Sequence, residues 1–201
     1  MEYWFAEQEA RLRNLPATKR YLYAEIDWSA RCLGILGARG TGKTTMMLQY
    51  LSEHHPGTEK ALYISVDHPR FQPLSLHDFG RNFREYGGRL LILDEVHKYP
   101  NWAGHIKTLY DSCPDLQIIF SGSSVLQMQE QNTDLSRRAL LYCLHGLSFR
   151  EFLLFELGES FSVLKLEDII QHHHACSREI NNRIRPLEHF RNYLHYGYYP
   201  F

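Results

Sequence analysis

The sequence predicts an α/β fold with a mainly parallel five-stranded sheet, and three observations support this prediction. Short apolar runs alternate with segments whose apolar residues recur at helical spacing, as in strands joined by crossover helices. The runs are almost continuously apolar, which is typical of strands covered on both faces. Glycine-rich, acidic or serine-containing turns follow three of the runs, at the edge where parallel sheets bind ligands.

The first part of the chain contains a helix, a strand and a second helix. We expect one helix in residues 1–23, broken near Pro16 because proline has no amide donor, and packed against the domain that follows. Residues 31–36 are apolar and end in a glycine-rich turn, which predicts the first buried strand. From Thr44 the apolar residues fall at helical spacing, and the pair Pro56–Gly57 ends this helix.

The second and third strands are predicted at residues 61–66 and 90–93, with a helix between them. Ser75 and Asp78 form a capping-box pattern at the start of that helix. The glycine pair Gly87–Gly88 ends it. The third strand then runs directly into two acidic residues.

The fourth and fifth strands are predicted at residues 117–120 and 139–144, separated by a polar loop at 130–136. Before the fourth strand lies a helix that we expect Asn101 to cap and Pro114 to close. The inner face of this helix is expected to consist of Trp102, Ile106, Leu109 and Tyr110.

After Leu147 the strand pattern stops and three helical segments follow, at residues 149–156, 167–176 and 186–195. Pro186 suits the first turn of the last helix, where its missing N–H has no helical partner to lose. The residues of this helix that we expect to point inward are Leu187, Phe190 and Leu194.

These patterns divide the chain into a core with its N-terminal helix, residues 1–147, and a helical lid or extension, residues 148–201. The last residues, 198–201, are apolar, whereas natural termini are usually polar. We therefore expect that the protein continues into a further C-terminal domain.

The composition favours a cytoplasmic protein. The 201 residues carry a formal net charge of −1, so no global field attracts nucleic acid or an anionic membrane. No apolar stretch is long enough to span a membrane, and the start lacks the basic and apolar regions of a secretory signal. The four cysteines form no CxxC pair and are expected to be reduced, with Cys32 and Cys143 as small apolar fillers in strands.

Three consecutive histidines, His172, His173 and His174, raise the question of a metal site. Adjacent residues of a helix point in different directions around its axis, so three in a row do not converge on one ion. We expect a solvated helix face instead.

A phosphate site is predicted by the pattern GxxxxGK[ST], which lies between a strand and a helix. A glycine-rich loop at a helix N-terminus offers backbone N–H groups and a favourable dipole to phosphate. In this pattern Lys43 reaches the β- and γ-phosphates, the Thr44 hydroxyl ligates Mg²⁺, and the Thr45 amide meets the α-phosphate. The predicted nucleotide-binding residues are Gly37, Ala38, Arg39, Gly40, Thr41, Gly42, Lys43, Thr44 and Thr45.

Asp94 and Glu95 end the third strand, and Ser121 follows the fourth. Asp94 is placed to hold Mg²⁺, usually through water, and Glu95 to polarise the water that attacks the γ-phosphate. A solvated charge at a strand end is the alternative for Glu95. Ser121 is a candidate hydrogen-bond donor to the γ-phosphate or to that water. One parallel sheet would place all three residues on the edge that carries the glycine loop.

Arg137 and Arg138 are candidates for an arginine that stabilises the transferred phosphoryl group, in cis or across an interface. An ordinary surface ion pair explains them equally well. Arg39 points either to solvent or to a partner. Asp67 and His68 end the second strand near the site, and a simple turn also explains them.

Four segments carry a resemblance to a known family: GARGTGKTTMMLQYL (37–51), LLILDEVHKYPNWAGHIKTLYD (90–111), IIFSGSSVL (118–126) and LSFREFL (147–153). In this order they resemble the bacterial and archaeal AAA_14 ATPases of the AAA+/STAND-like P-loop superfamily. The likeness extends over most of the chain, from about residue 20 to its end.

The resemblance implies a P-loop NTPase three-layer sandwich with a sheet of the additional-strand (ASCE) type in the order 5-1-4-3-2. It also implies ATP rather than GTP, Mg²⁺, and Glu95 as the catalytic glutamate. YLHYGYYP (193–200) is similar to the family's junction with a C-terminal domain of unknown function (DUF4143). In this family a glycine often precedes the arginine after the polar loop. Here the run is Ser136-Arg137-Arg138, so the resemblance does not decide which arginine has the role.

We expect Mg²⁺-dependent ATP binding and hydrolysis that drives a conformational or assembly switch. The absence of an [NT]KxD run disfavours a GTPase, and the acidic pair suits water activation rather than a small-molecule kinase. The alternative is a non-hydrolysing, ATP-gated module that binds protein or DNA.

The expected partners are ATP and ADP together with an unknown protein or a second copy of the chain, and no membrane. Support for DNA is weak, because the arginines available for it are scattered and form no basic stripe. They are Arg70, Arg81, Arg84, Arg178, Arg183 and Arg185.

Overall fold

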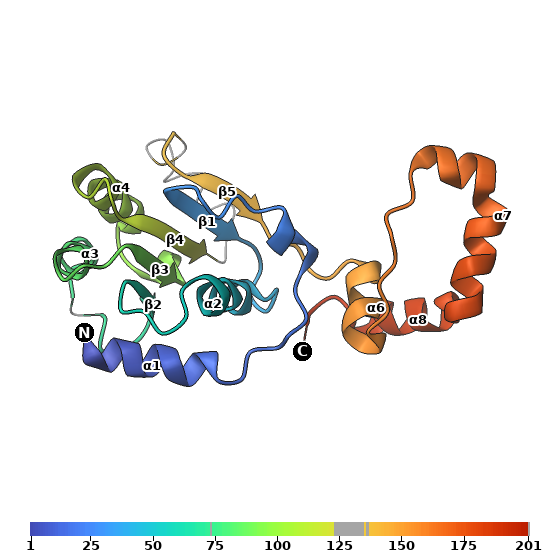
Figure 1. Cartoon of the computed structure of the whole chain (residues 1–201), viewed down its shortest axis with the longest axis horizontal. Coiled ribbons are helices and arrows are strands. Elements are labelled where there is room, and N and C mark those ends of the chain that lie inside the picture. Colours follow the sequence, from blue (N-terminus) through green and yellow to red (C-terminus); the bar gives the residue numbers. More distant parts are fainter. Residues whose placement is uncertain (73, 123–134, 136, 201) are drawn as a thin grey trace. The chain divides into compact units, whose positions relative to one another are not determined.

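The computed structural model describes residues 1–72, 74–122, 135 and 137–200 (Figure 1). The chain forms two compact units, Met1–His145 and Gly146–Phe201. The first unit contains the sheet, and the second is helical. Among the described residues, no helix combines the length and the apolarity that crossing a membrane requires.

The first unit is built around a sheet of five strands that all run parallel. In spatial order they are β2 (Ala61–Ser65), β3 (Leu90–Asp94), β4 (Gln117–Gly122), β1 (Cys32–Leu36) and β5 (Leu140–Cys143). The predicted order is therefore confirmed. Every residue of β1 and β3 is buried, as their uninterrupted apolar runs predict.

Helices cover both faces of the sheet (Figure 1). α2 (Lys43–His54) packs on one face, and α3 (Leu76–Glu85) with α4 (Trp102–Ser112) packs on the other. Because successive strand residues point to opposite faces, Ile92 joins the apolar cluster under α2 while Leu93 joins the cluster under α3 and α4. The sheet therefore has two apolar cores, one on each side.

The first helix, α1 (Glu2–Leu12), packs against β2, which is an edge strand of the sheet. The buried side chain of Gln8 accepts a hydrogen bond from the Tyr63 N–H at 2.7 Å and donates to the Ala61 carbonyl at 3.4 Å. These backbone groups lie on the side of β2 that has no neighbouring strand. The amide of Gln8 thus satisfies part of an exposed sheet edge.

Some local predictions fail at this level. The helix expected in residues 1–23, with a break near Pro16, is confirmed only before the break: α1 ends at Leu12, and after Pro16 a 3-10 turn, η1 (Tyr21–Ala24), takes the place of further α-helix. Proline disfavours helical conformation in the residue before it as well as at its own position. The chain therefore leaves the helix several residues before the proline.

Two side chains also depart from prediction. Asn101 is the N-cap residue of α4, but its side chain makes no capping hydrogen bond and its backbone is left-handed, with φ 50°. Asparagine tolerates this conformation better than most residues do, which explains its presence. Cys143 is exposed rather than a buried filler, because β5 is an edge strand. By contrast, Ser75 accepts a hydrogen bond from the Asp78 N–H at 3.3 Å, as its position predicts.

The second unit contains α6 (Phe149–Leu157), α7 (Leu166–Arg183) and α8 (Pro186–Tyr196). α6 begins with a capping box, in which the Ser148 hydroxyl accepts from the Glu151 N–H and the Glu151 carboxylate accepts from the Ser148 N–H. The predicted helical character of this part of the chain is confirmed. A small core of Phe152, Leu153 and Ile184 holds the unit together.

Of the α8 residues predicted to point inward, Leu187 and Leu194 do not, and Phe190 does so only in part, with its ring 5.2 Å from that of Phe149. Leu187, Phe190 and Leu194 are 84%, 41% and 68% exposed, and no residue of α7 or α8 is buried. A unit with so few elements cannot cover every apolar face of its helices.

The three consecutive histidines, His172 to His174, are exposed on α7, where His172 has non-helical backbone angles at a kink. Within the described part of the chain, no group of three or more His, Cys, Asp or Glu side chains is arranged to hold a metal ion.

Candidate nucleotide-binding site

The groups predicted to bind phosphate lie at the carboxyl edge of the sheet. The glycine loop follows β1, Asp94 ends β3 and Ser121 lies near the end of β4. β4 lies between the other two strands, so Ser121 stands between the loop and the acidic pair. The parallel sheet thus brings together residues that are far apart in the sequence.

The glycine loop passes close to neighbouring backbone before it enters α2. A Cβ atom at Gly37 would lie 2.2 Å from the carbonyl oxygen of Leu144, so no side chain fits there. Gly42, the N-cap of α2, has a φ of 94°, which favours glycine. The free N–H groups of the first helical turn and its dipole together make this end of α2 suitable for an anion.

The other residues of the loop differ in exposure. Ala38 and Arg39 are exposed, whereas Thr41 is buried and its hydroxyl donates to the Ala38 carbonyl at 2.9 Å. Gly40 also has a positive φ, and Thr45 lies in the first turn of α2. The loop is therefore held from inside by Thr41 while Arg39 faces outward.

Lys43 is buried, and its ammonium donates to the carbonyl oxygens of Gly37 at 2.9 Å and Ala38 at 2.8 Å. Burial lowers the pKa of this ammonium, while Glu95 and Asp94 act in the opposite direction. Both acceptors are neutral groups of the loop itself. Phosphate oxygens are anionic and accept stronger hydrogen bonds, so this cation fits a phosphate ligand in the loop.

Asp94 is the centre of a hydrogen-bond network and is only 3% exposed. Its Oδ2 accepts from the Thr44 hydroxyl at 2.6 Å and from the Tyr63 hydroxyl at 2.7 Å. Its Oδ1 accepts from the Ser121 hydroxyl and from the Glu95 N–H at 3.1 Å. Four donors from separate parts of the unit therefore fix the position of this carboxylate.

Strand alternation explains why these side chains meet. Tyr63 is opposite Ile92 in the register of β2 and β3, and Ile92 is opposite Ile119 in the register of β3 and β4. Asp94 and Ser121 lie two residues after these isoleucines and so point to the same face of the sheet. α2 covers this face, and its first turn places Thr44 beside Asp94.

Glu95 follows Asp94 with a left-handed backbone, φ 58° and ψ 37°, and precedes the 3-10 turn η2 (Val96–Lys98). Its N–H donates to Ser121 Oγ at 3.0 Å, and its carboxylate lies 3.5 Å from His97 Nε2. Burial lowers the pKa of His97, and the charge of Glu95 partly opposes this. Left-handed backbone costs a residue with a Cβ on the order of 1 kcal/mol, so the surrounding contacts hold Glu95 in this orientation.

The structure separates the two candidate arginines. Arg138 pairs with Asp111 of α4 through contacts of 2.9 and 3.1 Å, whereas Arg137 is exposed. The predicted polar loop before them, apart from Leu135, lies outside the described residues.

The residues at the end of β2 make turn contacts. Asp67 accepts a hydrogen bond from the Ser65 hydroxyl at 2.5 Å, and His68 lies 3.2 Å from the Tyr3 hydroxyl of α1.

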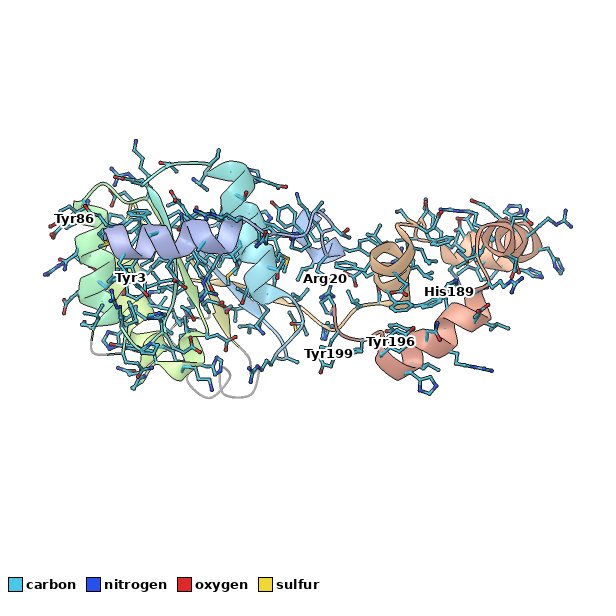
Figure 2. All side chains as sticks on the ribbon, turned by 90° about the horizontal axis from the view of Figure 1, so that it is seen from below. Tyr3, Arg20, Tyr86, His189, Tyr196 and Tyr199 are labelled. Carbon is cyan, nitrogen blue, oxygen red and sulfur yellow. The ribbon has the colours of Figure 1, made fainter. Side chains whose placement is uncertain are left out.

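Sequence reasoning missed two side chains near the site. Arg20, labelled in Figure 2, is buried and donates to the carbonyl oxygens of Thr41 at 2.5 Å and His145 at 2.9 Å. It therefore supports the glycine loop from the segment before β1. The Tyr63 hydroxyl contacts Asp94 from the middle of β2. In the sequence alone, Tyr63 has the pattern of an ordinary core residue. The signal available for this contact was the hydroxyl of a tyrosine within an apolar strand, because a buried tyrosine hydroxyl usually needs a hydrogen-bond partner.

Comparison with known families finds a match. The AAA_14 family model, described as an AAA domain, matches residues 29–153. No curated protein is significantly similar to the chain.

Solved structures that resemble the chain include C. elegans PCH-2, with TM-score 0.45 and 15% identity over 77% of this chain and 44% of that one. AMPPCP-bound DnaA from Aquifex aeolicus has TM-score 0.44 and 18% identity over 74% and 53%. The S. cerevisiae Hsp104–ADP complex has TM-score 0.40 and 16% identity over 74% and 23%. The chain thus covers less than two thirds of each of these structures.

Proposed function

We propose that this chain, which belongs to the AAA_14 family of AAA domains, binds ATP with Mg²⁺ and hydrolyses it. Membership of the family supports nucleotide binding. The single observation that carries the proposal is the network in which Asp94 accepts hydrogen bonds from Thr44, Ser121 and the Glu95 amide beside the glycine loop.

The residues of the loop would bind the triphosphate. Lys43, which donates to two loop carbonyls, would turn its ammonium to the β- and γ-phosphates. The Thr44 hydroxyl and the Asp94 carboxylate, 2.6 Å apart, would hold Mg²⁺, since hydroxyl and carboxylate oxygens are the ligands this ion prefers. When bound, Mg²⁺ would neutralise charge on the β- and γ-phosphate oxygens.

Glu95 would act as the general base for the attacking water. The water oxygen bonds to the γ-phosphorus while the bond from that phosphorus to the β,γ-bridging oxygen breaks, giving ADP and inorganic phosphate. The proton of the water passes to the Glu95 carboxylate. Ser121 Oγ accepts from the Glu95 N–H and its hydroxyl donates to Asp94, so it would keep the two carboxylates in place relative to each other.

We propose further that hydrolysis drives a conformational or assembly switch. Of the two candidate arginines, Arg137 is the better one for the phosphates of a second copy, because it is exposed while Arg138 is tied to Asp111. Arg39 also faces outward from the loop and is available to a partner.

Turnover and binding of ATP with Mg²⁺ test this proposal in the wild type and in variants Lys43→Ala and Glu95→Gln. We expect Lys43→Ala to weaken ATP binding, because it removes the cation from the loop. Glu95→Gln is expected to keep ATP and to lose turnover by about 10²-fold or more, the contribution of a general base. Glu59→Gln, an exposed carboxylate between α2 and β2, is the matched control and should behave like the wild type.

The outcomes separate the candidate functions. Equal inactivity of the wild type and Glu95→Gln, with ATP bound to both, would contradict hydrolysis. That result would favour the alternative function, an ATP-gated module that binds protein or DNA without hydrolysis. Absence of ATP binding by the wild type would contradict both.

A further inference from the structure

Tyr63 contacts the Asp94 carboxylate from the neighbouring strand β2. The tyrosine is 2% exposed, and its hydroxyl donates to Asp94 Oδ2 at 2.7 Å. The same oxygen accepts the hydroxyl of Thr44, the residue proposed to ligate Mg²⁺. One carboxylate oxygen thus joins a phenol from the sheet to the first turn of α2.

The ring of Tyr63 belongs to an apolar cluster. Its side chain lies in the cluster under α2, with Met46, Met47 and Ile92 among the neighbours in that cluster. Phenylalanine would fill the same volume and would need no acceptor. The hydroxyl therefore adds a specific contact with Asp94 that packing alone does not require.

The phenol is a permanent donor. Its hydroxyl donates to Asp94 Oδ2 at 2.7 Å, because an ionised carboxylate oxygen can only accept. A protonated hydroxyl whose hydrogen is directed to Oδ2 restrains rotation of the carboxylate.

α1 holds Tyr63 from the other side. The Tyr63 N–H donates to Gln8 Oε1 at 2.7 Å, and the guanidinium of Arg11 lies 5.6 Å from the centre of the tyrosine ring. Backbone, ring and hydroxyl therefore each have a defined partner. Tyr63 is a rigid support rather than a mobile side chain.

We propose that Tyr63 is a positioning residue for Mg²⁺. Its hydroxyl holds Asp94 Oδ2 in the orientation in which Asp94 and Thr44 together receive the ion. Without it, the donors to this carboxylate among the described residues are Thr44, Ser121 and the Glu95 amide, of which Thr44 contacts Oδ2. The inference rests on the proposed function in one respect, namely that this site takes ATP with Mg²⁺.

The test is the Mg²⁺ dependence of ATP binding by the full chain, measured by calorimetry with ATP in EDTA and over a series of free Mg²⁺ concentrations. For Tyr63→Phe we expect ATP affinity in EDTA within about twofold of the wild type, since the phenol does not touch the loop that binds phosphate. The Mg²⁺ concentration for half-maximal enhancement of binding is expected to rise about three- to tenfold, the effect of losing one typical intramolecular hydrogen bond. Saturating Mg²⁺ should restore the wild-type level.

Tyr50→Phe is the matched control. Tyr50 is another buried tyrosine, on α2, and its hydroxyl lies 3.5 Å from the Trp28 carbonyl rather than near Asp94. Loss of this hydroxyl should leave the Mg²⁺ dependence unchanged. Equal shifts in both variants, or no shift in Tyr63→Phe, would overturn the inference, and so would a melting temperature of Tyr63→Phe below the temperature of the titration.

This experiment distinguishes the inference from the proposed hydrolysis, because it measures binding alone. A wild type that binds ATP more tightly with Mg²⁺ but does not turn it over would contradict hydrolysis, and the shift in Tyr63→Phe would still support the role of Tyr63. A wild type whose ATP binding ignores Mg²⁺ would overturn the role of Tyr63 and leave nucleotide binding standing.

Discussion

The two compact units bury their apolar residues to very different extents. In the first unit Leu91 and Phe120 are completely buried between the sheet and its helices. In the second unit Leu187 and Ile170 are 84% and 67% exposed. The buried core of its described residues consists of Phe152 and Leu153 of α6 and Ile184 before α8. Helices on both faces of a parallel sheet bury its apolar side chains, whereas most apolar side chains of α7 and α8 are not buried in a core.

Most of the buried polar groups lie in the first unit. In the first unit the buried groups Gln8, Arg20 and Asp94 have partners at hydrogen-bond distance. In the second unit the ion pairs Arg183–Glu159 and Arg185–Glu188 are partly or largely exposed, and Glu151 is buried in the capping box of α6. A site that must hold atoms in fixed positions therefore lies in the unit whose packing can fix them.

The largest expected difference comes from truncating core leucines. Leu91→Ala removes a side chain with no exposure and should lower the free energy of unfolding of the first unit by about 2–5 kcal/mol, from lost transfer energy and the cavity left behind. Leu187→Ala should change the free energy of unfolding of the second unit by less than about 0.5 kcal/mol. Urea unfolding followed by circular dichroism measures both, and similar losses would show that α8 is covered in solution.

A smaller difference is expected between two arginines. Arg20→Met should cost the first unit about 1.5–3 kcal/mol, because the carbonyl groups of Thr41 and His145 lose a donor that is charged and buried. Arg183→Met should cost the second unit less than about 1 kcal/mol, since exposed ion pairs contribute little. Thermal unfolding of each variant checks this ordering. Equal costs would mean that water replaces the contacts of Arg20.

A capping box begins α6 in the second unit. Ser148→Ala should destabilise this helix by about 1 kcal/mol, because the N–H of Glu151 loses its acceptor. Hydrogen exchange of the α6 amides measures the effect directly. Ser162→Ala, an exposed serine of the same unit outside the helices, should not alter exchange. Unchanged protection in Ser148→Ala would show that packing of Phe152 and Leu153, rather than the cap, holds α6.

The smallest effect concerns pH and the first unit. Burial lowers the pKa of His55, with the charge of His54 acting in the same direction, and burial also lowers the pKa of His97. The unfolded chain then binds more protons at these two histidines than the folded one, so their contribution to stability is lost as the pH falls below about 6.5.

Unfolding midpoints at pH 7.5 and 5.5 measure this dependence. His55→Gln should lose less stability than the wild type between the two values, because it removes one group whose protonation opposes folding. An equal loss in both proteins would assign the dependence to other groups.

Several elements were predictable because their causes are local. The loop at Gly37–Thr44 follows a strand and precedes a helix, as its pattern indicates, and β1 and β3 are buried as their apolar runs require. The start of α8 at Pro186 was predictable because proline, which lacks an N–H, is favoured in the first turn of a helix. The order of the strands came from the family resemblance and is confirmed by the sheet. Which arginine serves the phosphoryl group stays a prediction.

The sequence by itself determined where strands, helices and the phosphate loop begin, because turn chemistry and apolar periodicity act over a few residues. Only the tertiary structure decided that Tyr63 reaches Asp94, that Arg20 supports the loop, and that Leu187 is exposed. These outcomes depend on which face of each element meets which neighbour, and that is settled by packing between segments far apart in the chain.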